Sequence, residues 1–407
     1  MWADSHSDIL HSGYLDESRV GMSARQRGGR SARQSHPGED SGIGFTGELR
    51  PGSVGGVFIQ GPLHRFVCSS YVYSTESRHR TGRLSLFEYN EEDTSCNLVK
   101  EISNLPAVFR VRTNANTDMF HDSPILAAPL SDGGILLTDT NLDDMVSIDG
   151  KDLRASHHAL ADSTSEETLM TDASFDESGG LFVTFSDGRA AHLASPCGQA
   201  GLDWAHLVGS DDGACWAVES LHPLNMPQTV ATGDDWGALC IWDIRSMPTH
   251  PVRKIVNETG GITSIHALSQ AEQMELDIGG GSLMLVGDYG GTLRLCDVRA
   301  LNRPLFEVSI GDGGDGLWDL DTAVAGPLER QSGRGGVSVG IAAMRSLFHR
   351  TTLINNAGVL SLSPVLPYDG PHEDEGLGYG VALLSDTDMA CGSFYDKTLS
   401  IARRAFQ

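Results

Sequence analysis

Paired cysteines, long apolar runs and an excess of positive charge are all missing from this chain of 407 residues. Its seven cysteines stand singly, without a Cys-x-x-Cys pair, which argues against a disulfide framework and favours a reducing, intracellular and cytoplasmic environment. No apolar run reaches the roughly 18 residues that a membrane span needs. The first residues mix aspartates with arginines, so a transit peptide is not expected either.

Basic residues are scarce, with 29 Lys and Arg against 54 Asp and Glu, and the net charge is −25. Such a field repels phosphates, which argues against a nucleic acid partner, and it attracts cationic partners. Solubility alone also explains this charge, and the composition does not choose between the two. No His or Cys pairs fall at ligand spacing, so no metal is expected. Gly42–Gly47 matches the dinucleotide fingerprint only by its letters, because neither a strand nor a helix flanks it, and no cofactor is expected.

The chain does contain a repeated strand-turn-strand unit. The unit starts at Gly233, Gly287 and Ser393, and it ends in a Trp-Asp pair or a changed form of that pair. The first two starts lie 54 residues apart and the last two lie 106 apart, which is twice 53. Repeats of this length that end in Trp-Asp are typical of the blades of a β-propeller.

Residues 51 to 407 make 357 residues, which is close to seven repeats of about 53. We therefore predict an all-β fold, a seven-bladed β-propeller of WD repeats over residues 51–407. Residues 1–50 are rich in Ser, Gly, Arg and His and lack periodic hydrophobicity, so they are expected to form a disordered tail.

Short apolar runs between Gly and Asp turns place the strands of the seven blades. In chain order they are expected at Phe66–Tyr73 with Arg83–Tyr89, at Ile125–Ala128 with Gly134–Leu137, at Ala173–Phe175, Leu181–Phe185 and Arg189–Leu193, and then within Trp216–Ile244, Ile262–Val298, Leu317–Leu353 and Tyr379–Ala402. The last blade lacks a strand, and Val57–Ile59 is the candidate that would complete it and close the ring. Three insertions rich in Gly and acidic residues are expected to be solvent loops, at Gln270–Gly281, Glu329–Gly336 and Tyr368–Gly378.

Several further motifs follow one another in the last four blades. They are Ala205-His206, Cys215-Trp216-Ala217, Gly233-Asp234-Asp235-Trp236-Gly237, Trp242-Asp243-Ile244-Arg245, Gly261-Ile262-Thr263-Ser264-Ile265, Gly287-Asp288-Tyr289, Gly316-Leu317-Trp318, Ala342-Ala343-Met344, His372 with Tyr379-Gly380, and Ser393-Phe394-Tyr395-Asp396. In this order they resemble the motifs of the diphthine methylesterase family of WD-repeat proteins, over roughly residues 200–402. The Ser-Phe-Tyr-Asp motif matches outright. The chain departs from the family pattern at Trp236, Gly290, Cys296 and Ala402.

The resemblance implies an activity and a partner. The family hydrolyses the methyl ester of methylated diphthine, a modified histidine of elongation factor 2, and so produces diphthine and methanol in diphthamide biosynthesis. Ester hydrolysis needs a nucleophile or an activated water, a base, and donors for the oxyanion. A propeller can place such groups around its axis, because each blade delivers loops there.

Four residues are candidates for this chemistry. Ser338 lies in a Gly-x-Ser-x-Gly pattern, but the residues after it resemble a blade strand and not the helix that a nucleophile elbow requires. His206 is a candidate base or a histidine that braces a blade turn. Asp235 and Asp396 lie in blade turns, where a carboxylate either takes part in catalysis or accepts hydrogen bonds from the turn. His372 lies among acidic residues and is expected to be a solvated loop histidine.

Four aromatic residues at or near blade turns are candidates for substrate binding: Trp236, Tyr289, Trp318 and Tyr395. Diphthine carries a trimethylammonium group, and aromatic faces hold such cations with roughly 0.5–2 kcal/mol per contact. We therefore hypothesise an aromatic cage made by some of these residues. Ordinary packing between blades is the alternative explanation.

Two hypotheses of other classes stay open. Trp242-Asp243-Ile244-Arg245, echoed by Cys296-Asp297-Val298-Arg299, fits the box with which some propellers dock on a ubiquitin-ligase adaptor as cullin substrate receptors. The same box also serves as an ordinary blade end. A scaffold without chemistry is the other alternative, because family aspartates are replaced at Trp236 and Gly290.

Overall fold

The computed structural model describes a subset of the 407 residues. These are residues 43–44, 50–60, 63–77, 79–114, 125–156, 168–194, 202–209, 213–246, 250–278, 281–310, 315–324, 336–345, 347–356, 358–363, 366–367, 377–385, 387–394 and 397–403. The chain divides into two compact units, Asp40–Val72 with Arg80–Gln407, and Met1–Glu39 with Tyr73–His79. In the second unit, Tyr73 and Ser74 end a strand, residues 75–77 form a turn and His79 begins a strand.

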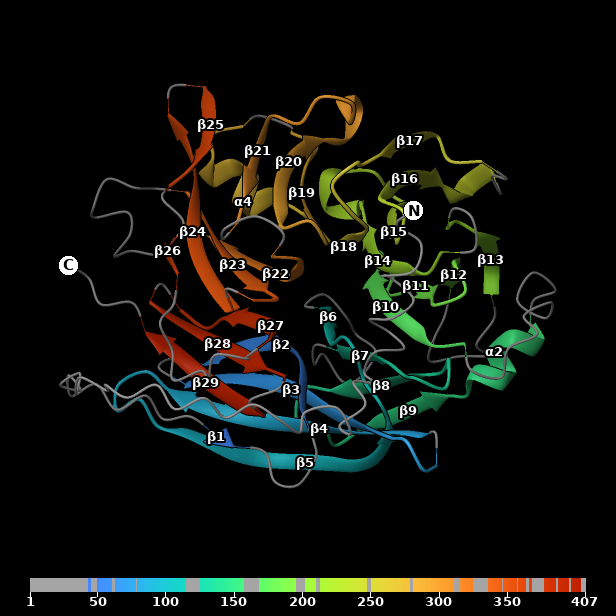
Figure 1. Ribbon diagram of the computed structural model, residues 1–407, viewed down its shortest axis with the longest axis vertical. Coiled ribbons are helices and arrows are strands. Elements are labelled where there is room, and N and C mark those ends of the chain that lie inside the picture. The colour runs from blue at the N-terminus through green and yellow to red at the C-terminus, as the bar shows by residue number, and fades with distance from the viewer. Residues whose placement is uncertain are drawn as a thin grey trace, which may run out of the picture. The chain divides into compact units, whose positions relative to one another are not determined.

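The larger unit is a seven-bladed β-propeller, as the sequence predicted (Figure 1). From the innermost strand outward, the first blade contains β2 (Arg50–Gln60), β3 (Leu63–Ser74), β4 (His79–Asn90) and β5 (Cys96–Pro106). The second blade contains β6 (Arg112–Asn114), β7 (Ile125–Pro129), β8 (Ile135–Asp139) and β9 (Met145–Ile148). The third blade contains β10 (Met170–Phe175), β11 (Leu181–Phe185), β12 (Arg189–Leu193) and β13 (Leu202–Leu207). Helix α2 (Gly150–Ser156) follows the second blade.

The last four blades follow the same plan. They contain β14 (Cys215–Ser220), β15 (Thr229–Asp234), β16 (Ala238–Asp243) and β17 (Arg253–Val256); β18 (Ile262–Ala267), β19 (Leu283–Asp288), β20 (Thr292–Asp297) and β21 (Phe306–Ser309); β22 (Leu317–Val324), β23 (Val337–Ala343), β24 (Leu347–Asn356) and β25 (Val359–Leu362), with β26 (Leu366–Pro367) on β24; and β27 (Gly378–Leu383), β28 (Asp388–Ser393), β29 (Thr398–Arg403) and β1 (Ile43–Gly44). Three short 3-10 helices lie among the described residues of these blades: η2 (His222–Leu224) follows β14, η3 (Ile244–Ser246) follows β16, and η4 (Val298–Ala300) follows β20.

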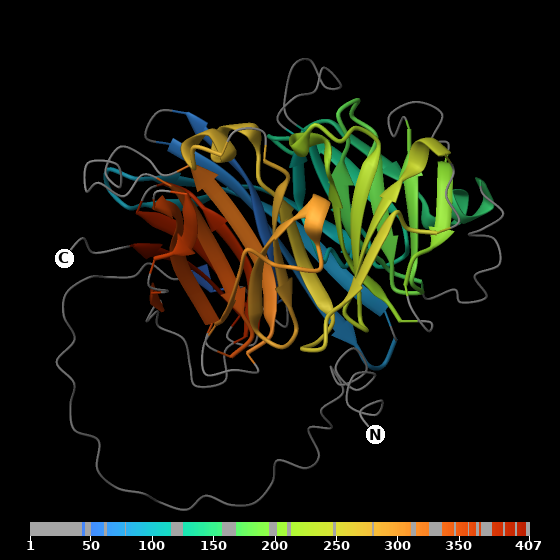
Figure 2. The same cartoon turned by 90° about the horizontal axis from the view of Figure 1, so that it is seen from above.

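The innermost strands form a closed ring. Each contacts the innermost strand of both neighbouring blades, in the order β2, β6, β10, β14, β18, β22, β27 and back to β2. We call these seven strands and their side chains the hub. Figure 2, turned by 90°, shows the strands of the fourth and fifth blades, coloured from yellow-green through yellow to orange, running across the thickness of the ring.

The ring closes differently from our expectation. The outer strand of the last blade is β1, which pairs with β29 through Ile43 opposite Leu399 and Gly44 opposite Thr398. Val57–Ile59, the predicted closing strand, lies instead within β2 and pairs with β3 in the first blade. The prediction was wrong because β1 has only two residues and carries no periodic signal that a sequence could show.

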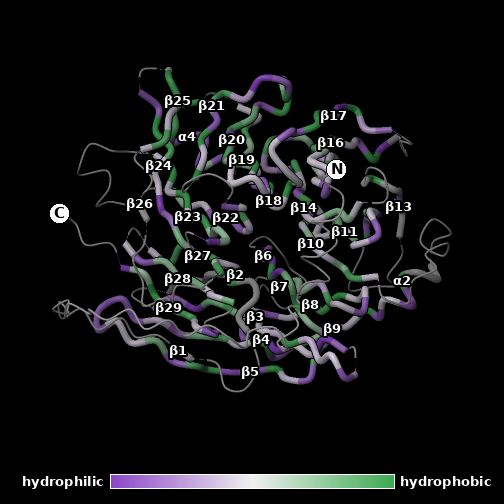
Figure 3. Tube along the Cα trace, in the orientation of Figure 1, coloured by the Kyte–Doolittle hydropathy of each residue, from purple (hydrophilic) through white to green (hydrophobic). Residues whose placement is uncertain are grey.

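Hydrophobic packing between blades explains the apolar strands. Every residue of β7, β8, β11 and β19 is buried, because each of these strands is covered on both faces by a neighbouring blade. In the described part of the chain, one hydrophobic cluster lies at each of the seven blade junctions. Figure 3 shows the matching hydrophobic segments in every blade. Burial of each such Leu, Ile or Phe contributes about 1.5–3 kcal/mol.

One of the expected solvent loops is partly a helix. α4 (Gln270–Glu275) begins with a capping box, in which the hydroxyl of Ser269 accepts from the Glu272 amide and the Glu272 carboxylate accepts from the Ser269 amide. Glu272 and Gln273 are buried, so this part of Gln270–Gly281 is not a solvent loop. The other two predicted loops lie outside the described residues, except for Gly336, which precedes β23, and Leu377 and Gly378, at the start of β27. No helix among the described residues has the length and apolar character to cross a membrane.

Candidate functional site

The innermost strands share an irregularity near their first residue. In five blades the register between the innermost strand and the next strand skips one residue, and it is always the second residue of the strand: Thr171, Trp216, Thr263, Trp318 and Tyr379. A bulge of this kind leaves the extra residue out of the ladder and redirects its side chain. The repeat therefore brings five side chains to one end of the hub.

Three of these five residues are aromatic, and they form a continuous layer. Ring centroids are 6.1 Å apart for Trp216 and Trp318 and 4.9 Å apart for Trp318 and Tyr379. Phe394, in the turn after β28, stacks on Tyr379 at 5.1 Å, and Tyr71 of β3 lies 5.3 Å from Phe394. We call these five residues the aromatic platform. Trp318 and Phe394 are partly exposed, whereas Tyr71, Trp216 and Tyr379 are buried.

Polar contacts at the edges of the platform fix three of its rings, those of Trp216, Tyr71 and Tyr379. Nε1 of Trp216 donates to Oδ1 of Asp235, in the turn between β15 and β16. The hydroxyls of Tyr71 and Tyr379 lie 3.0 Å apart and share a hydrogen bond. Nε1 of Trp318 differs, because it is buried and has no hydrogen-bond partner among the described residues. A buried indole N–H usually has an acceptor, so this donor calls for an explanation.

A buried arginine lies next to the platform. Arg110, in the connection from β5 to β6, forms an ion pair with Asp319 of β22, and both side chains are almost fully buried. Its Nη2 donates to the carbonyl oxygens of Thr263 and Trp318, at 2.8 and 2.7 Å. Its Cζ lies 5.7 Å from the centroid of the Trp318 ring. The side chain thus reaches across the hub from the second blade to the fifth and sixth.

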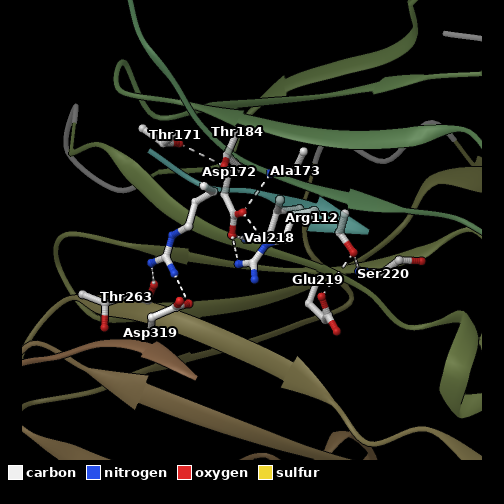
Figure 4. Close-up of polar contacts among 12 residues, drawn as sticks. Arg112, Thr171, Asp172, Ala173, Thr184, Val218, Glu219, Ser220, Thr263 and Asp319 are labelled. Atoms are coloured by element: carbon white, nitrogen blue, oxygen red, sulfur yellow. Dashed lines mark hydrogen bonds and ion pairs between the residues drawn. The ribbon is translucent and has the colours of Figure 1, made fainter. Parts of the chain in front are cut away.

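A second ion pair continues this charged layer. Arg112 of β6 binds Asp172 of β10 through Nε at 2.8 Å and Nη2 at 2.9 Å. Asp172 is fully buried, and its carboxylate also accepts from the amides of Ala173 and Val218. Figure 4 shows Arg112 and Asp172 facing each other, with Asp319 and Thr263 nearby. Because every carboxylate oxygen has a partner, the cost of burying the pair is offset.

Farther along β14, β18 and β22 lie the titratable side chains of Glu219, His266 and Asp321, and Thr322 of β22 and Glu272 of α4 join them. We call these five residues the acid-base cluster. The Thr322 hydroxyl donates to Glu272, and its oxygen lies 2.6 Å from Nε2 of His266. Burial raises the pKa of Glu219, although His266 and the Ala267 amide oppose the shift. Burial also raises the pKa of Asp321 to about 6. This carboxyl therefore exchanges its proton close to neutral pH.

The structure separates the candidate catalytic residues. Ser338 lies in β23, the second strand of the sixth blade, where it pairs with Ala323 and Thr352 and accepts from Arg350 at 3.2 Å. The Gly-x-Ser-x-Gly pattern is therefore a strand, not a turn into a helix. His206 lies on β13, the outermost strand of the third blade, with its ring 5.7 Å from Trp242. Asp235 accepts a hydrogen bond from the platform residue Trp216. Asp396 and His372 lie outside the described residues.

The aromatic candidates are also divided. Trp318 is part of the platform, and Tyr395 lies outside the described residues. Trp236 is 45% exposed in the turn next to Asp235, and Tyr289 occupies the turn of the fifth blade that corresponds to Asp235. The sequence did not single out Trp216, Tyr379, Phe394 or Tyr71 as site residues. A signal existed for three of them, because Trp216, Trp318 and Tyr379 take the second place in their blades' first strands.

The Trp-Asp-x-Arg box has a structural explanation. Nε1 of Trp242 donates to the Thr232 hydroxyl at 3.0 Å, and Asp243 binds the guanidinium of Arg245 across η3. The same pairing joins Asp297 and Arg299 across η4. In the described part of the chain, no three His, Cys, Asp or Glu side chains gather at metal-ligand geometry.

Comparison with known proteins gives one similarity over most of the chain. The chain is 25% identical over 377 residues to a protein of Dictyostelium discoideum named "Diphthine methyltransferase homolog", covering 83% of this chain and 92% of the relative. No protein-family model matches the chain. The resemblance to diphthine methylesterase-type proteins that the motifs of the last four blades indicated is thus confirmed as a similarity that also takes in the earlier blades.

Proposed function

We propose that this protein hydrolyses the methyl ester of methylated diphthine on elongation factor 2, releasing methanol and diphthine. The similarity to a protein named for diphthine supports the pathway. The observation that carries the reaction site is the aromatic platform, which the repeat assembles from bulged residues of three blades.

The chemistry of the substrate fits this platform. The ester carbonyl of methylated diphthine is bonded to the carbon that carries the trimethylammonium group, so a cation site and an ester site must lie side by side. Aromatic faces bind quaternary ammonium groups with about 0.5–2 kcal/mol each. Trp318 and Phe394 offer partly exposed rings, and the Trp318 indole N–H is a donor without an acceptor among the described residues.

Hydrolysis would proceed by addition of water to the ester carbon. The water oxygen forms a bond to this carbon, one proton of the water leaves to a base, and the carbonyl oxygen becomes an oxyanion. We propose that the Trp318 side chain, whose Nε1 is buried without an acceptor among the described residues, turns when the substrate binds, so that Nε1 donates to this oxygen, a type of contact that contributes most in the transition state. Collapse then breaks the bond to the methoxy group, which takes up a proton and leaves as methanol. The product keeps a carboxylate beside its cation.

The direct test uses purified protein and the methylated intermediate of elongation factor 2. We expect the modified peptide to lose the mass of one methylene group in mass spectrometry, and methanol to appear in equal amount. Trp318→Ala should abolish both signals. An unchanged peptide mass with the wild-type protein would rule out this function. If the immobilised protein then retained a ubiquitin-ligase adaptor, the receptor hypothesis would replace it.

A further inference from the structure

The turn that holds Asp235 recurs in the other blades. In five blades the residue directly after the second strand donates its amide to the carbonyl oxygen of the residue directly before the innermost strand, and in the second blade the donor lies two residues after β7 and the acceptor five residues before β6. These residues are Ser131, Ser186, Asp235, Tyr289, Met344 and Phe394, and their acceptors are Ala107, Leu169, Ala214, Gly261, Gly316 and Leu377. The bond therefore belongs to the fold, and Asp235 has counterparts with which its side chain can be compared.

The comparison shows which oxygen of Asp235 makes a hydrogen bond that the turns of other blades also contain. In the second and third blades a serine hydroxyl accepts the returning amide, from Ala107 to Ser131 and from Leu169 to Ser186, both at 2.9 Å. In the fourth blade Oδ2 of Asp235 accepts the amide of Ala214 at 3.1 Å. One oxygen is sufficient for this bond. The second oxygen of Asp235 is additional, and it accepts the indole N–H of Trp216.

This additional contact acts on the platform in two ways. It fixes the orientation of a bulged side chain that is not held by the strand ladder. It also puts a carboxylate on the rim of the indole, and hydrogen bonds to an ionised acceptor are about twice as strong as neutral ones. A negative charge beside an aromatic ring increases the attraction of that ring for a cation.

We propose that Asp235 is a positioning residue that orients Trp216 and makes it a receptor for the quaternary ammonium group of the substrate. The proposal rests on the proposed function for the identity of this ligand. It gives Asp235 a task that differs from that of a general base, because its carboxylate acts through the Trp216 ring. It also distinguishes the fourth blade from the blades whose turn carries serine.

Three variants separate the two tasks of Asp235. Asp235→Ser keeps the bond that serines make in the second and third blades and loses the contact with Trp216. Asp235→Asn keeps an acceptor for the indole and loses the charge. Ser186→Ala removes the corresponding fold bond in the third blade and leaves the platform intact. Circular dichroism and thermal unfolding verify that each variant is folded.

The readout is binding of tetramethylammonium chloride by isothermal titration calorimetry, with ammonium chloride as the ionic control. We expect Asp235→Ser to weaken binding about 5- to 30-fold, Asp235→Asn to lie between it and the wild type, and Ser186→Ala to stay within about twofold. With the methylated elongation factor, Asp235→Ser should raise KM more than it lowers kcat.

The outcomes distinguish the proposal from the function on which it rests. Equal affinity of folded Asp235→Ser and wild type for tetramethylammonium overturns the role of Asp235 and leaves ester hydrolysis in place. No binding by the wild type overturns the role as well. Failure of hydrolysis together with the expected loss of binding in Asp235→Ser would support the cation site and reject the esterase. If Asp235→Ser does not fold, Asp235→Asn decides, since a wild-type affinity in that variant excludes the effect of the charge.

Discussion

Trp318 has two chemical features that act on different parts of the proposed substrate. Its rings pack between Trp216 and Tyr379, whereas its indole nitrogen is buried without an acceptor in the described part of the chain. Phenylalanine at this position would keep an aromatic face and lose the N–H. The residue therefore allows cation binding and oxyanion stabilisation to be separated by one substitution.

We expect Trp318→Phe to lower kcat for the methyl ester about 100-fold, because one oxyanion donor typically contributes 10²–10³ in rate. Affinity for tetramethylammonium should change less than about threefold, since the ring remains. Steady-state kinetics and calorimetry on the same preparation provide both numbers. As a matched control, Trp204→Phe removes another buried indole N–H without an acceptor among the described residues, on β13 of the third blade, and should leave kcat within about twofold. A wild-type kcat in Trp318→Phe would exclude the indole as the donor.

Asp321 should make the stability of the protein depend on pH. Its pKa in the folded state is raised by burial to about 6, above the usual value of an unfolded aspartate. Between these two values the folded state binds more protons than the unfolded state, so the free energy of unfolding falls as pH rises through this window. Above this pH window, the buried and ionised Asp321 carboxylate lowers the free energy of unfolding by its full amount.

Asp321→Asn is therefore expected to increase the free energy of unfolding at pH 7–8 by about 1–2 kcal/mol. The amide oxygen of asparagine can still accept from the Leu383 amide, which Asp321 binds at 2.7 Å. The gain should shrink as pH is lowered to about 5. Urea unfolding at several pH values measures it, and a gain that is independent of pH would contradict the explanation.

At the scale of elements, α4 shows how a short helix holds part of the hub. Ser269 and Glu272 form its capping box, and Glu272 also accepts from Thr322 on β22. The cap thus joins the connection after β18 to the innermost strand of the next blade. The cap orients a buried carboxylate as well as starting the helix.

We expect Ser269→Ala to lower the free energy of unfolding by about 1 kcal/mol, because the Glu272 amide loses its acceptor. Ser269→Asp should retain most of the stability, since aspartate is an equally good N-cap. Both variants can be compared by urea unfolding at pH 7. If Ser269→Ala is as stable as the wild type, the cap has no energetic role.

The sequence predicted the strands that recur from blade to blade, and it missed two elements that occur once, β1 and α4. The apolar runs such as Ile125–Ala128 and Leu181–Phe185 lie in β7 and β11, because continuous burial between blades leaves a plain signal. β1 was missed because two residues have no period. α4 was taken for a loop although the Ser269 and Glu272 spacing is that of a capping box.

The site was harder to predict than the fold. Asp235 and Trp318 were among the candidates, because motifs around blade turns single out such residues. The other residues of the platform come from distant parts of the chain. Tyr71, for example, lies more than 300 residues before Tyr379, with which it shares a hydrogen bond. Contacts of this kind depend on the closure of the ring, which no local pattern describes.

For the whole molecule, Arg110 is a link across the ring. Its partner Asp319 is 209 residues away in sequence, and the guanidinium also binds two carbonyl oxygens of the fifth and sixth blades. Neighbouring blades are held by hydrophobic clusters, whereas this side chain connects blades that are not neighbours. We therefore expect the Arg110–Asp319 ion pair to stabilise the ring as a whole, whereas each hydrophobic cluster stabilises one junction between neighbouring blades.

We expect Arg110→Met to lower the free energy of unfolding by about 3–5 kcal/mol, because the Asp319 carboxylate and two carbonyl oxygens lose their donor in a buried place. Adding Asp319→Asn should recover part of this loss, since asparagine removes the unpaired charge and can still accept from the Val381 amide. Arg245→Met is the matched control, because Arg245 forms its ion pair with Asp243 at the exposed surface and such pairs contribute little. Denaturant unfolding of the wild type, Arg110→Met, the double variant and Arg245→Met measures these differences in the free energy of unfolding. If the double variant is no more stable than Arg110→Met, the cost does not come from the buried charge, and the link across the hub is only a matter of packing.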